Sequence, residues 1–330
     1  MPIRVLLAAL LATALAVTAP AALAQTAWKP DRNVEIVVGV SAGGGIDRTA
    51  RLVQKILQDR QLIDVTASVL NKPGGGGTIA HTYISQRAGD AHTWEITATS
   101  LLTNHILGRS AFNHKDFTPV AMLYDEYIGF LVRQDSPLKT GKDLLAALKA
   151  DPESLPIGIA TAAGNTNHIT AGLAAKAAGG DVRKLKVVIF SSGGESMTAL
   201  LGGHVAVVAT PSANSISHLQ AGRMRVLAIA APARLEGALA TVPTWKEQGA
   251  NIVVANWRPV VGPKGWTAPQ IAYWEEAFAR LVASDEWKKE VARVGGVNHY
   301  MNSRDLAAYF DAQYAQFRAV LTELGLAKHP

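Results

Sequence analysis

Short apolar and β-branched runs alternate along the chain with longer amphipathic stretches rich in Ala, Leu and Lys. The first run, VEIVVGV at 34–40, leads through a glycine-rich loop into the amphipathic stretch 48–59, and this order recurs. Strands that alternate with helices of such length predict an α/β fold with mostly parallel sheets flanked by helices. The expected strands are 34–40, 64–70, 93–99, 127–133, 155–160, 185–190, 204–209, 224–230 and 251–257, and the expected helices between them include 48–59, 141–150, 166–178 and 196–201.

The last quarter of the chain has helical rather than strand periodicity. Thr267, with Pro269 two residues later, is typical of a helix start, and apolar residues at helical spacing follow as far as Gly295 and Gly296. A final helix is expected over 303–324. One side of it carries the residues that are predicted to face the core: Leu306, Tyr309, Phe310, Tyr314 and Phe317.

The segment 1–24 has a pattern of its own. Arg4 precedes an apolar stretch at 5–17, and the tripeptide ALA at 22–24 is a small-x-small cleavage signal. This order is typical of a secretory signal peptide, so cleavage is predicted after Ala24. A transmembrane anchor is the alternative, but it needs about 20 unbroken apolar residues, and Pro20 interrupts the stretch. We therefore expect export to the periplasm.

Removal of this leader leaves about 306 residues, more than one hydrophobic core usually serves, so two domains are expected.

The formal net charge is +6, and the leader contributes only Arg4, so the mature chain carries about +5. Lys and Arg are spread along the chain rather than clustered, which disfavours nucleic-acid binding. Cysteine is absent, and no two of the nine histidines stand four residues apart. We therefore expect no disulfide, no metal and no cofactor.

Several junctions from strand to helix are rich in glycine and hydroxyl residues. They follow expected strands at the carboxyl end, where open α/β sheets bind ligands, and each opens a helix whose first N–H groups lack partners. These loops are therefore suited to holding negative charge. They contain Ser41 with Gly43 to Gly45, NKPGGGGT at 71–78, Thr99 with Ser100, ATAAGNTNH at 160–168, and SSGGES at 191–196.

The first of these loops also matches the Gly-x-Ser-x-Gly pattern of serine hydrolases, at Gly39, Ser41 and Gly43. A nucleophile elbow needs an earlier loop to supply an oxyanion donor, and then an acid and a histidine in order. Ser41 follows the first strand of the mature chain, with about 16 residues before it. Nothing in the sequence pairs a histidine with an acid and Ser41, so the hydrolase interpretation is disfavoured.

A dinucleotide fingerprint is disfavoured too, because position 41 is Ser and the second strand ends in Leu70-Asn71 rather than in an acid. A site that holds an anion through backbone N–H groups requires fewer specific residues in the loop. Glycines let the backbone fold around a carboxylate, and the following helix donates its free N–H groups. Asp47 is unexpected beside an anion, and it either caps its own helix or faces a polar group of the ligand.

A set of short motifs, in order over nearly the whole mature chain, resembles the periplasmic solute receptors of tripartite tricarboxylate transporters, also called TctC- or Bug-type receptors. Each motif is weak alone, but the ordered set is specific to that family. The motifs are WKP at 28–30, GGGIDRTAR at 43–51, NKPGGGG at 71–77, KDFTPVAML at 115–123, GNTNH at 164–168, LLGGHV at 200–205, ATVPTWKEQG at 240–249 and NWRPVVGPKGWTAP at 256–269.

This resemblance implies a type II periplasmic-binding fold, in which two α/β lobes close on a small organic acid. After the signal peptide at 1–24, lobe 1 would comprise 25–125 and 232–330, and lobe 2 would comprise 126–231. The receptor would bind a mono-, di- or tricarboxylate and deliver it to the membrane subunits of a tripartite tricarboxylate-type transporter. It would act as a monomer and not as an enzyme.

The resemblance also implies which residues hold the ligand, because loops from the two lobes face each other in such receptors. From lobe 1 these are Ser41, Gly43, Gly44, Gly45, Asp47, Thr99 and Ser100. From lobe 2 they are Thr161, Gly164, Asn165, His168, Ser191, Ser192 and Gly193.

Several positions depart from the usual residues of the family, so the ligand stays open. Ala42 stands where Pro is common, Ala206 where Asp is common, Pro259 where Gly is common, and SSG at 191–193 replaces Tyr-Lys-Gly. Arg258 would either meet a second ligand carboxylate or form an ion pair. An exported serine hydrolase and a receptor that feeds a membrane sensor are the alternative functions.

Overall fold

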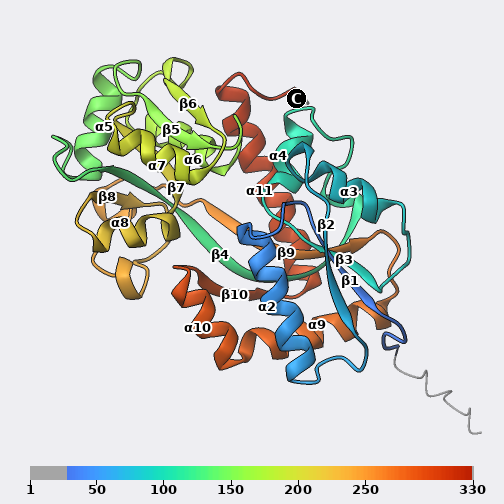
Figure 1. Ribbon diagram of the computed structural model, residues 1–330. Helices are drawn as coiled ribbons and strands as arrows, with labels where there is room; N and C mark the ends of the chain where they lie inside the picture. Colours follow the sequence, from blue (N-terminus) through green and yellow to red (C-terminus); the bar gives the residue numbers. More distant parts are fainter. Residues whose placement is uncertain (1–27, 329–330) are drawn as a thin grey trace, which may run out of the picture.

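The computed structural model describes residues 28–328, which form a curled ten-stranded sheet flanked by helices (Figure 1). The predicted signal peptide lies outside the described residues. The strands are β1 (Val34–Val38), β2 (Ala67–Asn71), β3 (Thr93–Ile96), β4 (Phe117–Arg133), β5 (Ile157–Ala160), β6 (Val187–Phe190), β7 (Val207–Pro211), β8 (Met224–Ile229), β9 (Ala255–Pro263) and β10 (Val297–Met301). The α-helices are α2 (Gly45–Asp59), α3 (Thr78–Ser85), α4 (Ser100–Ile106), α5 (Gly141–Ala150), α6 (Thr166–Ala177), α7 (Gly193–Leu201), α8 (Ile216–Gln220), α9 (Ala268–Ala283), α10 (Asp285–Arg293) and α11 (Ser303–Glu323).

The 17-residue strand β4 holds the sheet together. Its residues 117–127 pair with β9, whereas residues 128–133 pair with β7 and β8. The strand order is β2-β1-β3-β9-β4-β7-β5-β6, with β10 and β8 also paired to β4. We call β2, β1, β3, β9 and β10 the first half of the sheet, and β7, β5, β6 and β8 the second half. In Figure 1, β4 crosses from the helices α5 to α8 towards α2, α9 and α10.

Each half contains a parallel part, as the alternating pattern predicts. β2, β1 and β3 pair in parallel, and so do β6, β5 and β7. β4 and β9 pair antiparallel with their neighbours, which the pattern did not predict. Of the 17 residues of β4, the sequence predicted only 127–133. Proline within a sheet is normally confined to edges and bulges. In the structure Pro119 lies beside a register shift, where proline is tolerated.

One apolar cluster packs under the first half of the sheet, against α2 and α9. The Trp94 ring of β3 meets the rings of Trp274 and Phe278 edge to face, with centroids 5.4 and 5.2 Å apart. Ile96 belongs to the same cluster. Because side chains alternate along a strand, Trp94 and Ile96 share this face and Glu95 points to the opposite one.

A larger cluster extends through both halves and includes the segment 232–254. The Trp245 ring meets the Phe130 ring of β4 edge to face, at 5.1 Å between centroids. The Gly141 amide donates a hydrogen bond to Gln248 Oε1 at 2.6 Å. This segment therefore packs on the second half, and the chain re-enters the first half at β9.

The helix expected after Thr267 is two helices in the structure. Thr267 N donates to Gln270 Oε1 at 2.7 Å at the start of α9, as the sequence pattern predicts. Ser284 then ends α9 and caps α10, because its hydroxyl accepts a hydrogen bond from Trp287 N at 3.3 Å. The spacing of apolar residues continues across this break, which hides it in the sequence.

The last helix, α11, starts at the residue that the sequence predicts. Leu306, Phe310 and Phe317 are buried, and Tyr309 and Tyr314 are half-buried. Helix α11 packs on β4, α4 and α6, and so contacts elements of both halves. Between residues 28 and 328, none of the helices combines the length and the apolar character that crossing a membrane requires.

Candidate functional site

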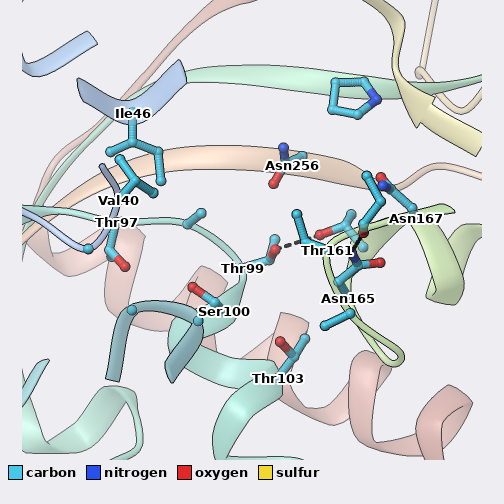
Figure 2. A pocket seen from close by; sticks show the side chains of 18 of the residues that line it. Val40, Ile46, Thr97, Thr99, Ser100, Thr103, Thr161, Asn165, Asn167 and Asn256 are labelled. Atoms are coloured by element: carbon cyan, nitrogen blue, oxygen red, sulfur yellow. Dashed lines mark hydrogen bonds between the residues drawn. The ribbon is translucent and has the colours of Figure 1, made fainter. Parts of the chain in front are cut away.

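A cavity of about 390 Å³ lies between the two halves of the sheet, beside the carboxyl ends of β1, β3, β5 and β7 (Figure 2). Its lining mixes apolar side chains, such as Val40 and Ile46, with hydroxyl and amide side chains. Figure 2 shows these polar groups reaching in from both sides. Open α/β sheets bind their ligands at the carboxyl ends of strands, which makes this cavity the candidate site.

The wall from the first half combines the start of α4 with the glycine loop before α3. Asn104 Nδ2 donates to the carbonyl oxygens of Gly75 and Gly76, at 3.3 and 3.0 Å. A Cβ at Gly39 would lie 2.7 Å from the Cα of Gly77, so only glycine permits this approach of two loops. The glycine loop is thus held against the cavity by its neighbours.

The wall from the second half is the N-terminus of α6. Asn165 caps this helix, because its Oδ1 accepts from His168 N at 3.1 Å and its Nδ2 donates to the Ala160 carbonyl at 2.6 Å. Thr161 has φ of 73°, a strained value for a β-branched residue and one that tends to occur at binding sites. Asn165, Thr166 and Asn167 at the start of α6 line the cavity, at the end of the helix where the dipole favours an anion.

Two contacts join the walls. The hydroxyls of Thr99 and Thr166 share a hydrogen bond, which Figure 2 marks with a dashed line from Thr99. Arg109 Nη1 donates to the Ala163 carbonyl at 3.0 Å. Thr99 stands before α4 in the first half and Thr166 opens α6 in the second. A ligand in the cavity therefore contacts both halves.

Arg258 of β9 lines the cavity as part of a buried ion pair. Its Nη2 lies 2.7 Å from Glu126 Oε2 of β4, and the two side chains are 7% and 12% exposed. Asn256 Nδ2 donates to the same carboxylate oxygen at 3.3 Å. Of the two roles that the sequence left open for Arg258, the structure shows the ion pair.

Glu95 is an acidic member of the lining. The residue is 1% exposed, and its Oε1 lies 3.4 Å from His81 Nε2 of α3. Its Oε2 has no hydrogen-bond partner in the described part of the chain. Burial raises the pKa of Glu95 well above its ordinary value and lowers the pKa of His81 to about 4. The surroundings therefore favour the neutral form of both groups.

Five of the residues predicted from the sequence meet at this cavity. Both halves contribute, as the resemblance implied, and the junctions after β3, β5 and β6 supply them. They are Thr99, Ser100, Thr161, Asn165 and Gly193.

The glycine loop after β1 folds on its own helix instead. The Asp47 carboxylate accepts hydrogen bonds from Gly43 N at 2.8 Å, Arg51 Nε at 3.0 Å and Asn71 Nδ2 at 2.9 Å. Burial by itself raises the pKa of Asp47, but these hydrogen bonds outweigh it and lower the pKa below its ordinary value. Ser41 is exposed, and no described histidine hydrogen-bonds its hydroxyl. Besides Asp47, the loop residues that do not line the cavity are Ser41, Gly43, Gly44 and Gly45, the last of which borders a neighbouring crevice of about 700 Å³.

The remaining predicted residues support the second wall from behind. His168 Nδ1 accepts from Gly164 N at 3.0 Å, and burial lowers the pKa of His168 to about 4, so the ring is neutral at pH 7. Ser192 Oγ accepts from Glu195 N at 3.2 Å and caps α7. Ser191 donates to the Glu195 carboxylate. These residues shape the loops after β5 and β6 without lining the cavity.

Sequence reasoning missed several lining residues. Glu95 gave a usable signal, since an acid in the otherwise uncharged run TWEITAT is unusual in a buried strand. Asn104 and Arg109 gave none, because they lie on or after a helix with no motif. Asn214 and Asn256 reach the cavity only through the folding of β7 and β9.

Two α/β halves of one sheet, with a cavity between them to which both contribute hydroxyl and amide side chains, are typical of a solute-binding protein. The chain belongs to the TctC family, described as "Tripartite tricarboxylate transporter family receptor", whose profile matches residues 49–326. The resemblance seen in the sequence motifs is thereby confirmed.

Individual relatives agree with this assignment. The chain is 29% identical over 320 residues to the "UPF0065 protein in gbd 5'region" of Cupriavidus necator, which covers 96% of this chain and 94% of the relative. A TctC solute-binding protein from Polaromonas superposes with a TM-score of 0.76 and 25% identity, over 89% of this chain and 99% of that one. The protein Rpa4515 of R. palustris, whose structure holds adipate, superposes with a TM-score of 0.77 and 24% identity, over 90% of this chain and 99% of that one. The predicted periplasmic-binding fold is confirmed by these superpositions.

Proposed function

We propose that this chain is a periplasmic receptor, not an enzyme, that captures a small carboxylate and delivers it to the membrane subunits of a tripartite tricarboxylate-type transporter. The observation that carries the proposal is the cavity to which both halves of the sheet contribute hydroxyl and amide side chains. The adipate held by Rpa4515 supports a carboxylate ligand. The signal peptide predicted at 1–24, with cleavage after Ala24, supports export, and we propose that the mature receptor acts as a monomer.

The lobes that we propose follow the two halves of the sheet. Residues 25–125 with 232–330 form lobe 1, and residues 126–231 form lobe 2. The change of partners along β4 near residue 127 supports the first boundary. The segment 232–254 of lobe 1 packs on lobe 2 through the contact of Trp245 with Phe130. Closure of the lobes would then assemble two half-sites around the ligand.

Within the cavity we propose that the first amides of α6 receive the ligand carboxylate. The hydroxyls of Thr99, Ser100 and Thr161 and the amide of Asn165 would complete its hydrogen bonds. A hydrogen bond to a charged group contributes about 1.5–3 kcal/mol, so a few such donors are sufficient for specific binding. The loop of Asp47 would not contact the ligand and would instead hold the start of α2 in place.

Thermal denaturation of the mature protein with mono-, di- and tricarboxylates tests this function. A bound carboxylate at about 100 times its dissociation constant should raise the free energy of unfolding by about 2.7 kcal/mol. Thr99→Val and Thr166→Val each remove one hydroxyl from one wall and should weaken binding by about 0.5–1.5 kcal/mol.

Thr198→Val is the matched control, because its hydroxyl bonds to Gly194 O within α7, away from the cavity lining. It should leave binding unchanged. Absence of stabilisation by every carboxylate, together with ester hydrolysis that depends on Ser41, would overturn the proposal in favour of the hydrolase.

A further inference from the structure

Strand β3 places Glu95 in the wall of the cavity, where few groups can pair with its carboxylate. Glu95 lies opposite Val37 of β1 and Val261 of β9 in the sheet. Its closest titratable neighbour in the described chain is His81 of α3, at 3.4 Å. The Thr97 hydroxyl hydrogen-bonds the same His81 nitrogen at 3.2 Å and also the Glu95 carboxyl group. A carboxyl group this deeply buried is normally matched by a cation, or it costs several kcal/mol.

No cation within the described chain provides that match. Besides Glu95, the charged residues of the lining are Arg109 and Arg258. Arg258 is already paired with Glu126, at 2.7 Å. Arg109 donates to the Ala163 carbonyl on the opposite wall. Glu95 Oε2 therefore stays without a hydrogen-bond partner beside a cavity that admits a ligand.

The two walls of the cavity differ in charge. Glu95 belongs to β3 in the wall from the first half, whereas the N-terminus of α6 forms the wall from the second half. Thr99 and Arg109 contact that second wall at Thr166 and Ala163. The wall of α6 therefore suits an anion, and Glu95 on the other wall suits a hydrogen-bond donor or a cation.

We propose that Glu95 is a specificity-determining residue that selects a carboxylate ligand with a protonated nitrogen at its far end, an amino carboxylate, over mono- and dicarboxylates. The inference rests on the proposed function, since it assumes that a carboxylate is bound at the N-terminus of α6. The ligand ammonium would donate to Glu95 and supply the missing counter-charge. A second carboxylate at this position would meet an acid and no free cation of the described lining.

The binding has a proton linkage of known sign. Burial holds the proton on Glu95 in the empty cavity. An ammonium group binds the ionised carboxylate best, so Glu95 releases its proton as the amino carboxylate binds. The advantage of the amino carboxylate over a plain monocarboxylate should therefore grow as the pH rises from acidic to neutral. His81, with a pKa of about 4, stays neutral over that range.

Titration calorimetry on the mature protein tests the inference with ligands of matched chain length. The first set is hexanoate, adipate and ω-aminohexanoate, and the second is butanoate, succinate and γ-aminobutanoate. In one of these sets the amino carboxylate should bind at least about tenfold more tightly than both companions, or 1.4 kcal/mol. Glu95→Gln and Glu95→Leu should remove that advantage while the monocarboxylate keeps its affinity.

Glu35→Gln is the matched control, because Glu35 lies on the neighbouring strand β1, bonds to Tyr83 and does not line the cavity. It should preserve the order of affinities. Tighter binding of a mono- or dicarboxylate than of either amino carboxylate, or an unchanged preference in both Glu95 variants, would overturn the inference and leave the receptor function standing. Failure of all these ligands and of the wider carboxylate panel would instead overturn the receptor function itself.

Discussion

The loop after β1 and the strand β3 each bury one carboxylate in the first half of the molecule, and Asp47 and Glu95 are both 1% exposed. Asp47 receives hydrogen bonds from a backbone amide, a guanidinium and a side-chain amide. Glu95 has a neutral histidine at 3.4 Å and one oxygen without a partner. The two pKa values shift in opposite directions. Three hydrogen bonds outweigh burial and lower the pKa of Asp47, whereas burial outweighs the hydrogen bond of Thr97 and raises the pKa of Glu95. A satisfied carboxylate stabilises its loop, and an unsatisfied one at a cavity indicates a place for a ligand.

The largest effect is expected from Asp47→Ala, which would leave Gly43 N and Asn71 without their acceptor. The free energy of unfolding should fall by about 3 kcal/mol, because a buried network of charge-assisted hydrogen bonds loses its centre. Chemical denaturation measures this change. Asp59→Ala, at the exposed end of the same helix, is the control and should cost less than about 0.5 kcal/mol. A similar cost for both variants would contradict the structural role of Asp47.

An effect of opposite sign is expected from Glu95→Leu. Removal of the unpartnered carboxyl should raise the free energy of unfolding at neutral pH by about 1–3 kcal/mol, the desolvation cost of such a group. The raised folded-state pKa of Glu95 means that its stabilising contribution is present below its unfolded pKa and is lost as the pH rises through the folded value. The gain in Glu95→Leu should therefore shrink towards acidic pH.

The stability contribution of Asp47 is expected to depend on pH in the opposite direction. Its lowered pKa means that its contribution is present above the unfolded pKa and is lost as the pH falls through the folded value. Urea denaturation at several pH values should show the cost of Asp47→Asn declining towards acidic pH. If Glu95→Leu loses stability at every pH, the difference between the two carboxylates disappears.

The smallest effect is expected from Ser41→Ala in the loop after β1. Ser41 is exposed and lies outside the cavity lining, so stability should change by less than about 0.5 kcal/mol. Carboxylate binding should also be unchanged, as measured by the ligand-induced shift of the melting temperature. A loss of binding in this variant would show that the loop reaches the ligand and that its role exceeds the support of α2.

Local patterns predicted the elements whose signals lie within a few residues. The starts of α6 and α11 and the strand β1 all follow from hydrophobic periodicity. Elements that depend on distant partners were not predictable in this way. Residues 117–126 of β4 were missed because they pair with β9, which lies far along the chain and shifts its register beside Pro119. The break between α9 and α10 was not predicted, because the spacing of apolar residues continues through Ser284.

By itself, the sequence determined the family, the α/β class and the loops rich in glycine and hydroxyl residues, because motifs and hydrophobic periodicity are local properties. Tertiary structure decided which of those loops line the cavity. The loop of Ser41 packs on its own helix because Asp47 accepts a hydrogen bond from Asn71 of β2. Thr99 and Thr166 hydrogen-bond each other because the two halves of the sheet place them side by side. Tertiary structure also decided that Glu95 lacks the partner that Asp47 has. Hydrogen bonds between residues far apart in the chain depend on the register and packing of strands, and no local pattern encodes them.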